Sequence, residues 1–193
     1  MGKFYGKVTD RKGQPLEGVE ILFIDLGQEV LASAYSSPEG DFYIQWDHPA
    51  QGMLSATAGK GEQPLGAWFM NLSSHRSSQV NLTLGNVEFL KFQRIRREAT
   101  GEEVLRFQLV QLEKVLGGAP ELSPPLTKEN LRILRGGAAV EGFTMERVLR
   151  KLPFMGSQVE EITLRFPLGN RGEDSLLELV YSTPSAFGML KSF

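Results

Sequence analysis

The chain of 193 residues contains no cysteine and only two histidines. The absence of cysteine excludes disulfide bonds, thiolate catalysis, cysteine-ligated zinc and iron–sulfur clusters. No apolar run approaches the roughly 20 residues that a membrane-spanning helix needs. A net charge of −2 argues against broad binding to nucleic acid, which relies on a concentrated positive field. The sequence therefore predicts a protein without cofactors, without a nucleic-acid partner and without a membrane span.

Composition favours a folded protein with many turns. Hydrophobic residues make up 41% of the chain and charged residues 23%, which is ordinary for a packed domain. The 21 glycines and 10 prolines suit a chain with frequent turns. Strand-like sequence already begins by Phe4, so we expect no signal peptide in this stretch. The compartment stays open: cytoplasmic, or extracellular or periplasmic if a leader has been removed.

Short strands are expected throughout the first part of the chain. Phe4 to Thr9 reads as a strand, and Asp10, Gly13 and Pro15 supply the turn after it. Between Ile21 and Asp25 both faces are apolar, as in a sandwich strand covered on its second side. A turn at Pro38-Glu39-Gly40-Asp41 precedes a strand whose inner face is predicted to hold Phe42, Ile44 and Trp46.

These residues resemble the carboxypeptidase regulatory-like domain, a transthyretin-like seven-stranded β-sandwich. The resemblance covers residues 4–84 and implies a non-catalytic accessory domain that packs beside enzymes, stiffens surface proteins or presents loops for binding. The usual Pro-Gly-aromatic approach to the penultimate strands is replaced here by Pro-Ala-Gln-Gly-Met-Leu. The matching segments are Gly6–Asp10, Gly13–Val19, Glu39–Ile44, Met53–Ala56 with Gly59, and Val80–Leu84.

The second part follows without a linker, because only Gly85-Asn86 separates two strand-like stretches. We therefore expect two domains, at residues 1–86 and 87–193, with a stiff junction between them. Val104 to Val115 is predicted to be a long strand, joined to the preceding strand by a hairpin at Thr100-Gly101. The stretch from Gly117 to Pro125 is too rich in glycine and proline for regular structure.

Two stretches of the second part can be read in more than one way. Residues 127–135 fit either a short helix capped by Thr127 or a strand at Leu131–Leu134. The sequence from Leu126 to Gly137 resembles bacterial Ig-like modules, and this resemblance favours the strand. In residues 144–152 the spacing of Met145, Val148, Leu149 and Leu152 favours a helix, which Pro153 would end.

A hairpin is expected near the end of the chain. Val159 to Phe166 and Leu176 to Thr183 alternate as half-buried strands do, and a polar loop lies between them. The tail from Pro184 to Phe193 is expected to be irregular. The predicted fold is mainly β: a transthyretin-like or Ig-like β-sandwich, then a second β-rich domain, Ig-like or α+β, with at most one or two short helices.

Trp46, His48 and Trp68 are the candidate ligand-binding residues. The two tryptophans could be core residues, or they could form an exposed aromatic patch for a glycan or a protein partner. His48 follows Asp47, but neighbours on a strand point to opposite faces, so the two need not converge. His75 lies in a polar stretch and reads as a solvated loop.

Other chemistry is weakly supported by the sequence. Calcium prefers six to eight oxygen ligands, and Asp25, Asp41 and Asp47 show no calcium-loop spacing. We expect a solvated strand face where basic residues alternate with Glu88 and Glu98. Phosphate loops, nucleophile elbows and zinc-protease motifs are absent, so neither catalytic nor metal-ligating residues are assigned. The basic residues of that strand are Lys91, Arg94, Arg96 and Arg97.

The leading hypothesis is a non-enzymatic binding or structural module of a bacterial surface or multi-protein assembly. Its partner would be a protein or a glycan, and an oligomer is compatible with the sequence. One alternative is an enzyme with a carboxylate-based site in the second domain, built from Glu160, Glu161, Glu173 or Asp174. Another is a self-assembling subunit that pairs an edge strand with a neighbour.

Overall fold

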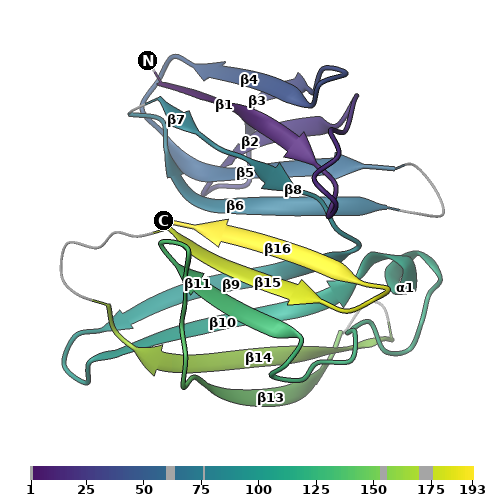
Figure 1. Ribbon diagram of the computed structural model, residues 1–193, viewed down its shortest axis with the longest axis vertical. Helices are drawn as coiled ribbons and strands as arrows, with labels where there is room; N and C mark the ends of the chain where they lie inside the picture. The colour runs from purple at the N-terminus through teal and green to yellow at the C-terminus, as the bar shows by residue number, and fades with distance from the viewer. Residues whose placement is uncertain (1, 60–63, 76, 153–155, 170–175) are drawn as a thin grey trace.

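The alternating residues of the first part form a two-sheet sandwich in the computed structural model (Figure 1). The structure describes residues 2–59, 64–75, 77–152, 156–169 and 176–193. One sheet has the order β4-β1-β7, with β8 also beside β1, and the facing strands have the order β6-β5-β2-β3. The strands are β1 Gly2–Thr9, β2 Glu20–Asp25, β3 Val30–Tyr35, β4 Asp41–Trp46, β5 Gln51–Ala58, β6 Leu65–Ser73, β7 Ser78–Gln79 and β8 Leu82–Thr83.

The core of this first sandwich is apolar. The rings of Phe4 and Phe23 meet edge to face at 4.9 Å between their centroids. Phe42 and Ile44 are buried beside them, and Trp46 packs against the same cluster, which confirms the predicted inner face of β4. Burying one such side chain stabilises a fold by about 1.5–3 kcal/mol. Local alternation of apolar residues therefore suffices to place this core.

The second part forms another sandwich below the first in Figure 1. One sheet has the order β13-β14-β10-β9, and the facing strands have the order β12-β11-β15-β16. Phe107, Ile162 and Tyr181 are among the buried residues between them. The elements are β9 Val87–Arg97, β10 Glu102–Gln111, α1 Leu112–Leu116, β11 Leu131–Arg135, β12 Ala138–Ala139, β13 Thr144–Lys151, β14 Gln158–Pro167, β15 Leu177–Ser182 and β16 Phe187–Ser192.

One sheet runs through both sandwiches, because β16 pairs in parallel with β6. Leu190 lies beside Trp68, and Lys191 lies beside Phe69. Successive side chains of a strand point to opposite faces. Phe69 belongs to the first core, whereas Trp68 and Leu190 face the second. The two covering sheets therefore lie on opposite faces of this shared eight-stranded sheet.

Glycine allows close contact where the sandwiches meet. A Cβ atom on Gly85 would lie 2.0 Å from the backbone oxygen of Phe187, and one on Gly188 would lie 2.3 Å from that of Val87. Asn86 joins the same segments: its Oδ1 accepts a hydrogen bond from the backbone N–H of Phe187 at 2.9 Å. We predicted two domains that meet at residue 86. The shared sheet contains strands from both sides of that residue, so this division remains a prediction.

Two expectations about the second part are wrong. The stretch 144–152 is strand β13, not a helix, because its backbone pairs with β14 from Thr144 to Lys151. The alternative strand at Leu131–Leu134 is confirmed as β11. The tail is also not irregular, since Phe187–Ser192 forms β16 between β15 and β6.

The expected terminal hairpin is also wrong. Both strands exist, but β14 pairs with β13 and β10, whereas β15 pairs with β11 and β16. The hairpin at Thr100-Gly101 is confirmed between β9 and β10. Strand β10 ends at Gln111, earlier than expected, because the chain turns into α1 at Leu112. The mainly β, sandwich class of the fold is confirmed.

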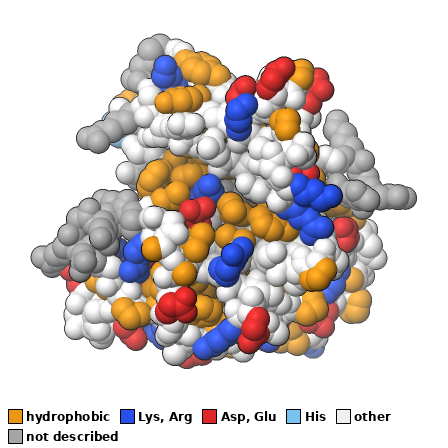
Figure 2. Space-filling model, in the orientation of Figure 1, with side chains coloured by type: hydrophobic (Ala, Val, Ile, Leu, Met, Phe, Trp, Pro, Cys, Tyr) orange, Lys and Arg blue, Asp and Glu red, His pale blue; other side chains and the backbone are white. Residues whose placement is uncertain are grey.

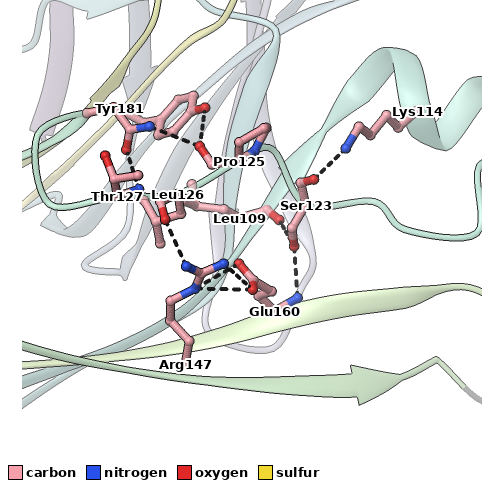
Figure 3. Close-up of polar contacts among 10 residues, drawn as sticks. Leu109, Lys114, Ser123, Pro125, Leu126, Thr127, Arg147, Glu160 and Tyr181 are labelled. Carbon is pink, nitrogen blue, oxygen red and sulfur yellow. Dashed lines mark hydrogen bonds and ion pairs between the residues drawn. The ribbon is translucent and has the colours of Figure 1, made fainter.

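The breaker-rich loop after α1 is held by side chains (Figure 3) as well as by backbone hydrogen bonds between Leu122 and both Gln111 and Gln158. The Ser123 hydroxyl donates to the backbone oxygen of Leu109 at 2.8 Å. The Tyr181 hydroxyl donates to the backbone oxygen of Pro125 at 2.9 Å. These bonds fix the loop over one end of the second core. No helix among the described residues has the length and apolar character of a membrane span.

Candidate functional site

An apolar groove of about 500 Å³ lies between the two sandwiches. Its floor comes from β5 and β6 of the first sandwich, and its wall comes from β9 of the second. We call it the junction groove. It is lined by Gln28, Met53, Trp68, Met70, Phe89, Leu90, Lys91 and Phe92.

The groove exists because β6 has two apolar faces. Trp68 and Met70 are two residues apart and point away from the first core, which is filled by Phe69 on the other face. Strand β9 stands beside this surface and is the last strand of its own sheet. Beyond Val87, which abuts Gly188 of β16, the outer edge of β9 has no partner strand among the described residues, so its backbone groups there are available to an added strand.

Strand β9 is bulged where it lines the groove. The register between β9 and β10 shifts between Arg106 and Gln108, opposite Lys91, whose φ is 52°. Gln28, on the other side of the groove, has a φ of 70°. Residues other than glycine rarely adopt a positive φ. Such a backbone conformation persists where the surrounding structure imposes it. The bulge turns Lys91 outward and lets Phe92 reach the second core.

Glu88 adjoins the groove through Trp68. Its carboxyl group lies over Gly66, where a Cβ atom would come within 1.9 Å of Glu88 Oε1. Burial raises the pKa of Glu88, and the nearby indole N–H of Trp68 partly opposes this by favouring the carboxylate. That indole N–H is buried and makes no hydrogen bond of standard geometry within the described residues. Trp68, which lines the groove, therefore has a partly buried acid beside its buried indole N–H.

The predicted binding residues are divided by the fold. Trp68 lies in the junction groove, whereas Trp46 is on β4, in the opposite sheet of the first sandwich. Trp46 packs partly against the first core and contacts His48 edge to face, at 5.8 Å between ring centroids. His75 is exposed in a turn. Of the three candidates, Trp68 therefore lines the junction groove, and Trp46 and His48 lie on the other side of the first sandwich.

Figure 2 shows hydrophobic side chains along the boundary between the sandwiches, with charged side chains among them. A second hollow at this boundary, of about 330 Å³, has a mixed lining that includes Asp10, Arg11 and Phe187. Arg11 crosses the boundary and donates from Nη1 to the backbone oxygen of Pro184 at 3.1 Å. The junction groove is the larger and more apolar of the two.

A buried ion cluster was not foreseen from the sequence. Glu103 is 1% exposed and faces the second core beside Leu105. It pairs with Arg94 of β9 and, at 2.7 Å, with Arg135 of β11. The expectation that Lys91, Arg94, Arg96 and Arg97 form one solvated face is therefore wrong, because Arg94 reaches inward to neutralise Glu103.

The two described members of the proposed catalytic carboxylates, Glu160 and Glu161, do not converge. Glu160 pairs with Arg147, and Glu161 pairs with Arg150 at 3.0 Å. These glutamates are neighbours on β14 and point to opposite faces of the sheet. Glu173 and Asp174 lie outside the described residues.

The aspartates considered for calcium have other roles. Asp25 accepts from the backbone N–H of Glu29 at 2.8 Å, and Asp41 pairs with Lys7 at 3.0 Å. The described residues contain no group of three or more histidines and carboxylates placed to hold a metal ion, and this covers Asp25, Asp41 and Asp47.

No protein-family model matches the chain, and no curated protein matches it in sequence. Two crystal structures of BcpA, the major pilin subunit of Bacillus cereus, align over 100% of this chain and 67% of theirs, with 9% and 8% identity and TM-scores of 0.35 and 0.32. A chain from the crystal structure of ICOS in complex with ICOS-L and an anti-ICOS-L VNAR domain aligns over 100% of both chains, with 7% identity and a TM-score of 0.34. Likeness of this degree carries no argument about function.

Proposed function

We propose that this protein is a non-enzymatic binding module of a surface or multi-protein assembly, and that its junction groove receives an extended segment of a protein partner. Its first sandwich, on this proposal, is a carboxypeptidase regulatory-like domain that serves as a scaffold. The observation that carries the proposal is the combination of an apolar floor with the free edge of β9 in one groove.

An extended peptide suits this groove better than a glycan. Strand addition uses backbone hydrogen bonds for affinity and pockets for alternate side chains for specificity. The edge of β9 offers the first, and the apolar surface around Met53, Trp68 and Met70 offers the second. A glycan needs many polar partners, but Gln28 and Lys91 are the only polar side chains in the described lining.

The charges of the molecule favour binding over catalysis. The carboxylates of Glu103, Glu160 and Glu161 are each paired with arginine, which suits a structural role. Glu88 has a raised pKa, but it stands beside an indole and not beside a second acid or a histidine. A general acid–base pair would need two titratable groups within reach of one substrate atom.

Fluorescence of Trp68 tests the proposal. The chain has two tryptophans, so Trp46→Phe leaves Trp68 as the sole reporter in the groove. We expect a capped peptide of alternating valine and threonine to shift its emission in a saturable way, because the peptide would cover Trp68. Met70→Glu should abolish the shift by placing a charge on the apolar floor.

Tyr43→Glu is the matched control, because Tyr43 is exposed on β4 in the opposite sheet. It should leave the titration unchanged. A titration with no saturable shift, or one that Met70→Glu leaves intact, would contradict binding in the groove. Turnover of a defined substrate that is lost on changing His48 or His75 would contradict the non-enzymatic assignment.

A further inference from the structure

Strand β13 is an exposed sheet edge of eight residues, Thr144–Lys151. It ends the order β13-β14-β10-β9, so β14 is its only partner strand among the described residues. Val148 is 46% exposed and Leu149 is 54% exposed. Such an edge presents a row of backbone donors and acceptors to which another strand can add.

The edge is held firmly in position. Arg147 pairs with Glu160 on β14 and donates from Nη1 to the backbone oxygen of Leu126 at 2.8 Å (Figure 3). Arg150 pairs with Glu161 at 3.0 Å. The loop and the neighbouring strand therefore present β13 in one conformation, which lowers the entropy lost when a partner strand adds.

Natural proteins protect edge strands with bulges, short length or charge. Strand β12, the edge strand of the facing sheet, has only two residues. Strand β13 is long and unbulged, and it carries charges of both signs. Charges of one sign repel any second copy, whereas charges of both signs can select a register in which they attract.

One self-pairing register of β13 brings opposite charges together. Two copies related by a two-fold axis perpendicular to the sheet keep their core faces on the same side, and the axis then passes between a residue and its own copy. With the axis at Val148, Glu146 of each copy lies opposite Arg150 of the other. Opposite charges in directly opposed positions stabilise a strand pair.

The neighbouring registers are all unfavourable. An axis at Arg147 opposes that residue to itself, and an axis at Leu149 opposes Arg147 to Lys151. An axis at Glu146 or at Arg150 also opposes like charges. Like charges directly opposed across strands are destabilising. Among the registers centred on residues 146 to 150, the charge pattern of β13 therefore favours only the one centred on Val148.

We propose that two copies of this chain associate through β13, antiparallel and centred on Val148, so that two four-stranded sheets join into one of eight strands. The exposed Val148 side chains meet at the axis and lose contact with water. An edge of eight residues buries little area compared with standard stable interfaces, so the dimer is weak and forms at high protein concentration. Its charge pairs are at the surface, so salt weakens it.

Sedimentation of the whole chain from about 1 µM to 1 mM tests the proposal, since a weak dimer dissociates in this range. We expect a monomer–dimer equilibrium. Glu146→Arg and Arg150→Glu should each raise the dissociation constant about tenfold or more, because each turns two attractive pairs into repulsive ones. The double variant E146R/R150E restores opposite charges in the same register and should recover the dimer.

Arg132→Glu is the matched control for Arg150→Glu, because Arg132 is exposed on β11 and both variants replace an arginine by a glutamate. It should not alter the dissociation constant. Thermal unfolding of each variant checks that the monomer is folded, since the double variant places like charges beside Arg165 and Glu161. A chain that stays monomeric at 1 mM, where a dimer of about 1 mM affinity would be seen, overturns the proposal. A dimer whose dissociation constant does not change in the single variants also overturns it, because its interface would then lie at another edge such as β3.

Discussion

The two sandwiches differ in what fills and closes their cores. In the first, the buried polar residues are serines: Ser36, Ser55 and Ser74. In the second, Glu103 and Gln108 are also buried, and Glu103 pairs with arginines from two strands. The described buried residues of the first core therefore combine apolar packing with neutral serine hydrogen bonds, whereas those of the second also include matched charges between its two sheets.

Because of this difference, the two sandwiches should lose stability after different kinds of substitution. Apolar cores lose stability in proportion to the volume removed, and their neighbours can partly collapse into the space. A buried ion cluster loses stability for a different reason. Removing one member leaves the other charged side chains buried, poorly solvated and without a partner of opposite charge. The second sandwich should therefore respond far more strongly than the first to loss of a single carboxylate.

The largest effect is expected for Glu103→Ala. The change leaves Arg94 and Arg135 without their common carboxylate, and breaking a buried pair in this way costs about 3–5 kcal/mol. Urea denaturation would measure the lost free energy of unfolding. Hydrogen exchange would show whether β9, β10 and β11 lose protection before the strands of the first sandwich.

Glu161→Ala is the matched control for that prediction. Its partner Arg150 is more than half exposed, so losing this surface pair should cost less than about 1 kcal/mol. If Glu103→Ala and Glu161→Ala had equal effects, the second core would not depend on its ion cluster, and the contrast between the two cores would fail.

An intermediate effect is expected for Gly188→Ala, which tests how the two sandwiches are joined. The new Cβ would lie 2.3 Å from the backbone oxygen of Val87, so β16 must move away from the junction. Forced overpacking of this kind typically costs about 1–3 kcal/mol. Because β16 also pairs with β6, protection from hydrogen exchange should fall in both sandwiches.

Gly27→Ala provides the comparison at a turn between β2 and β3. The nearest atom to its added Cβ is a carboxylate oxygen of Asp25 at 3.2 Å, and Gly27 does not need a positive φ. Its stability should change little. If protection fell in the second sandwich alone after Gly188→Ala, the shared sheet would not couple the two halves.

The sequence predicts the first sandwich well because its signals are local. Turns at Gly13 and Gly40 carry glycine where φ is positive, and the strands on their outer sides, β1 and β4, alternate between buried and more exposed side chains. In the second sandwich, strands β14 and β15 are consecutive but pair with different neighbours. Alternation shows that a strand exists, but it does not show which strand lies beside it.

The candidate site was predictable only in part, for the same reason. Trp68 could be singled out as an unusual apolar residue, but the groove around it requires β16 to pair with β6. That strand lies in the tail, which lacks clear alternation. Glu103 did leave a signal: it shares the inner face of β10 with Leu105 and Phe107, and a charge on such a face needs a buried partner.

The smallest effect is expected for Glu88→Gln, and it concerns pH. Burial raises the folded-state pKa of Glu88 above its ordinary value of 4.5, so the folded protein holds this proton more tightly than the unfolded chain. The resulting stability is present below pH 4.5 and is lost as pH rises through the folded-state pKa. Glutamine stays neutral throughout, so Glu88→Gln should flatten this fall in urea denaturation measured at successive pH values.

Glu141→Gln, at an exposed position, should leave the pH dependence as it is in the unchanged protein. Glu88 lies beside Trp68 at the boundary between the sandwiches, and burial disfavours its ionised form. An identical pH profile for Glu88→Gln and the unchanged protein would mean that the carboxyl group beside Trp68 is solvated.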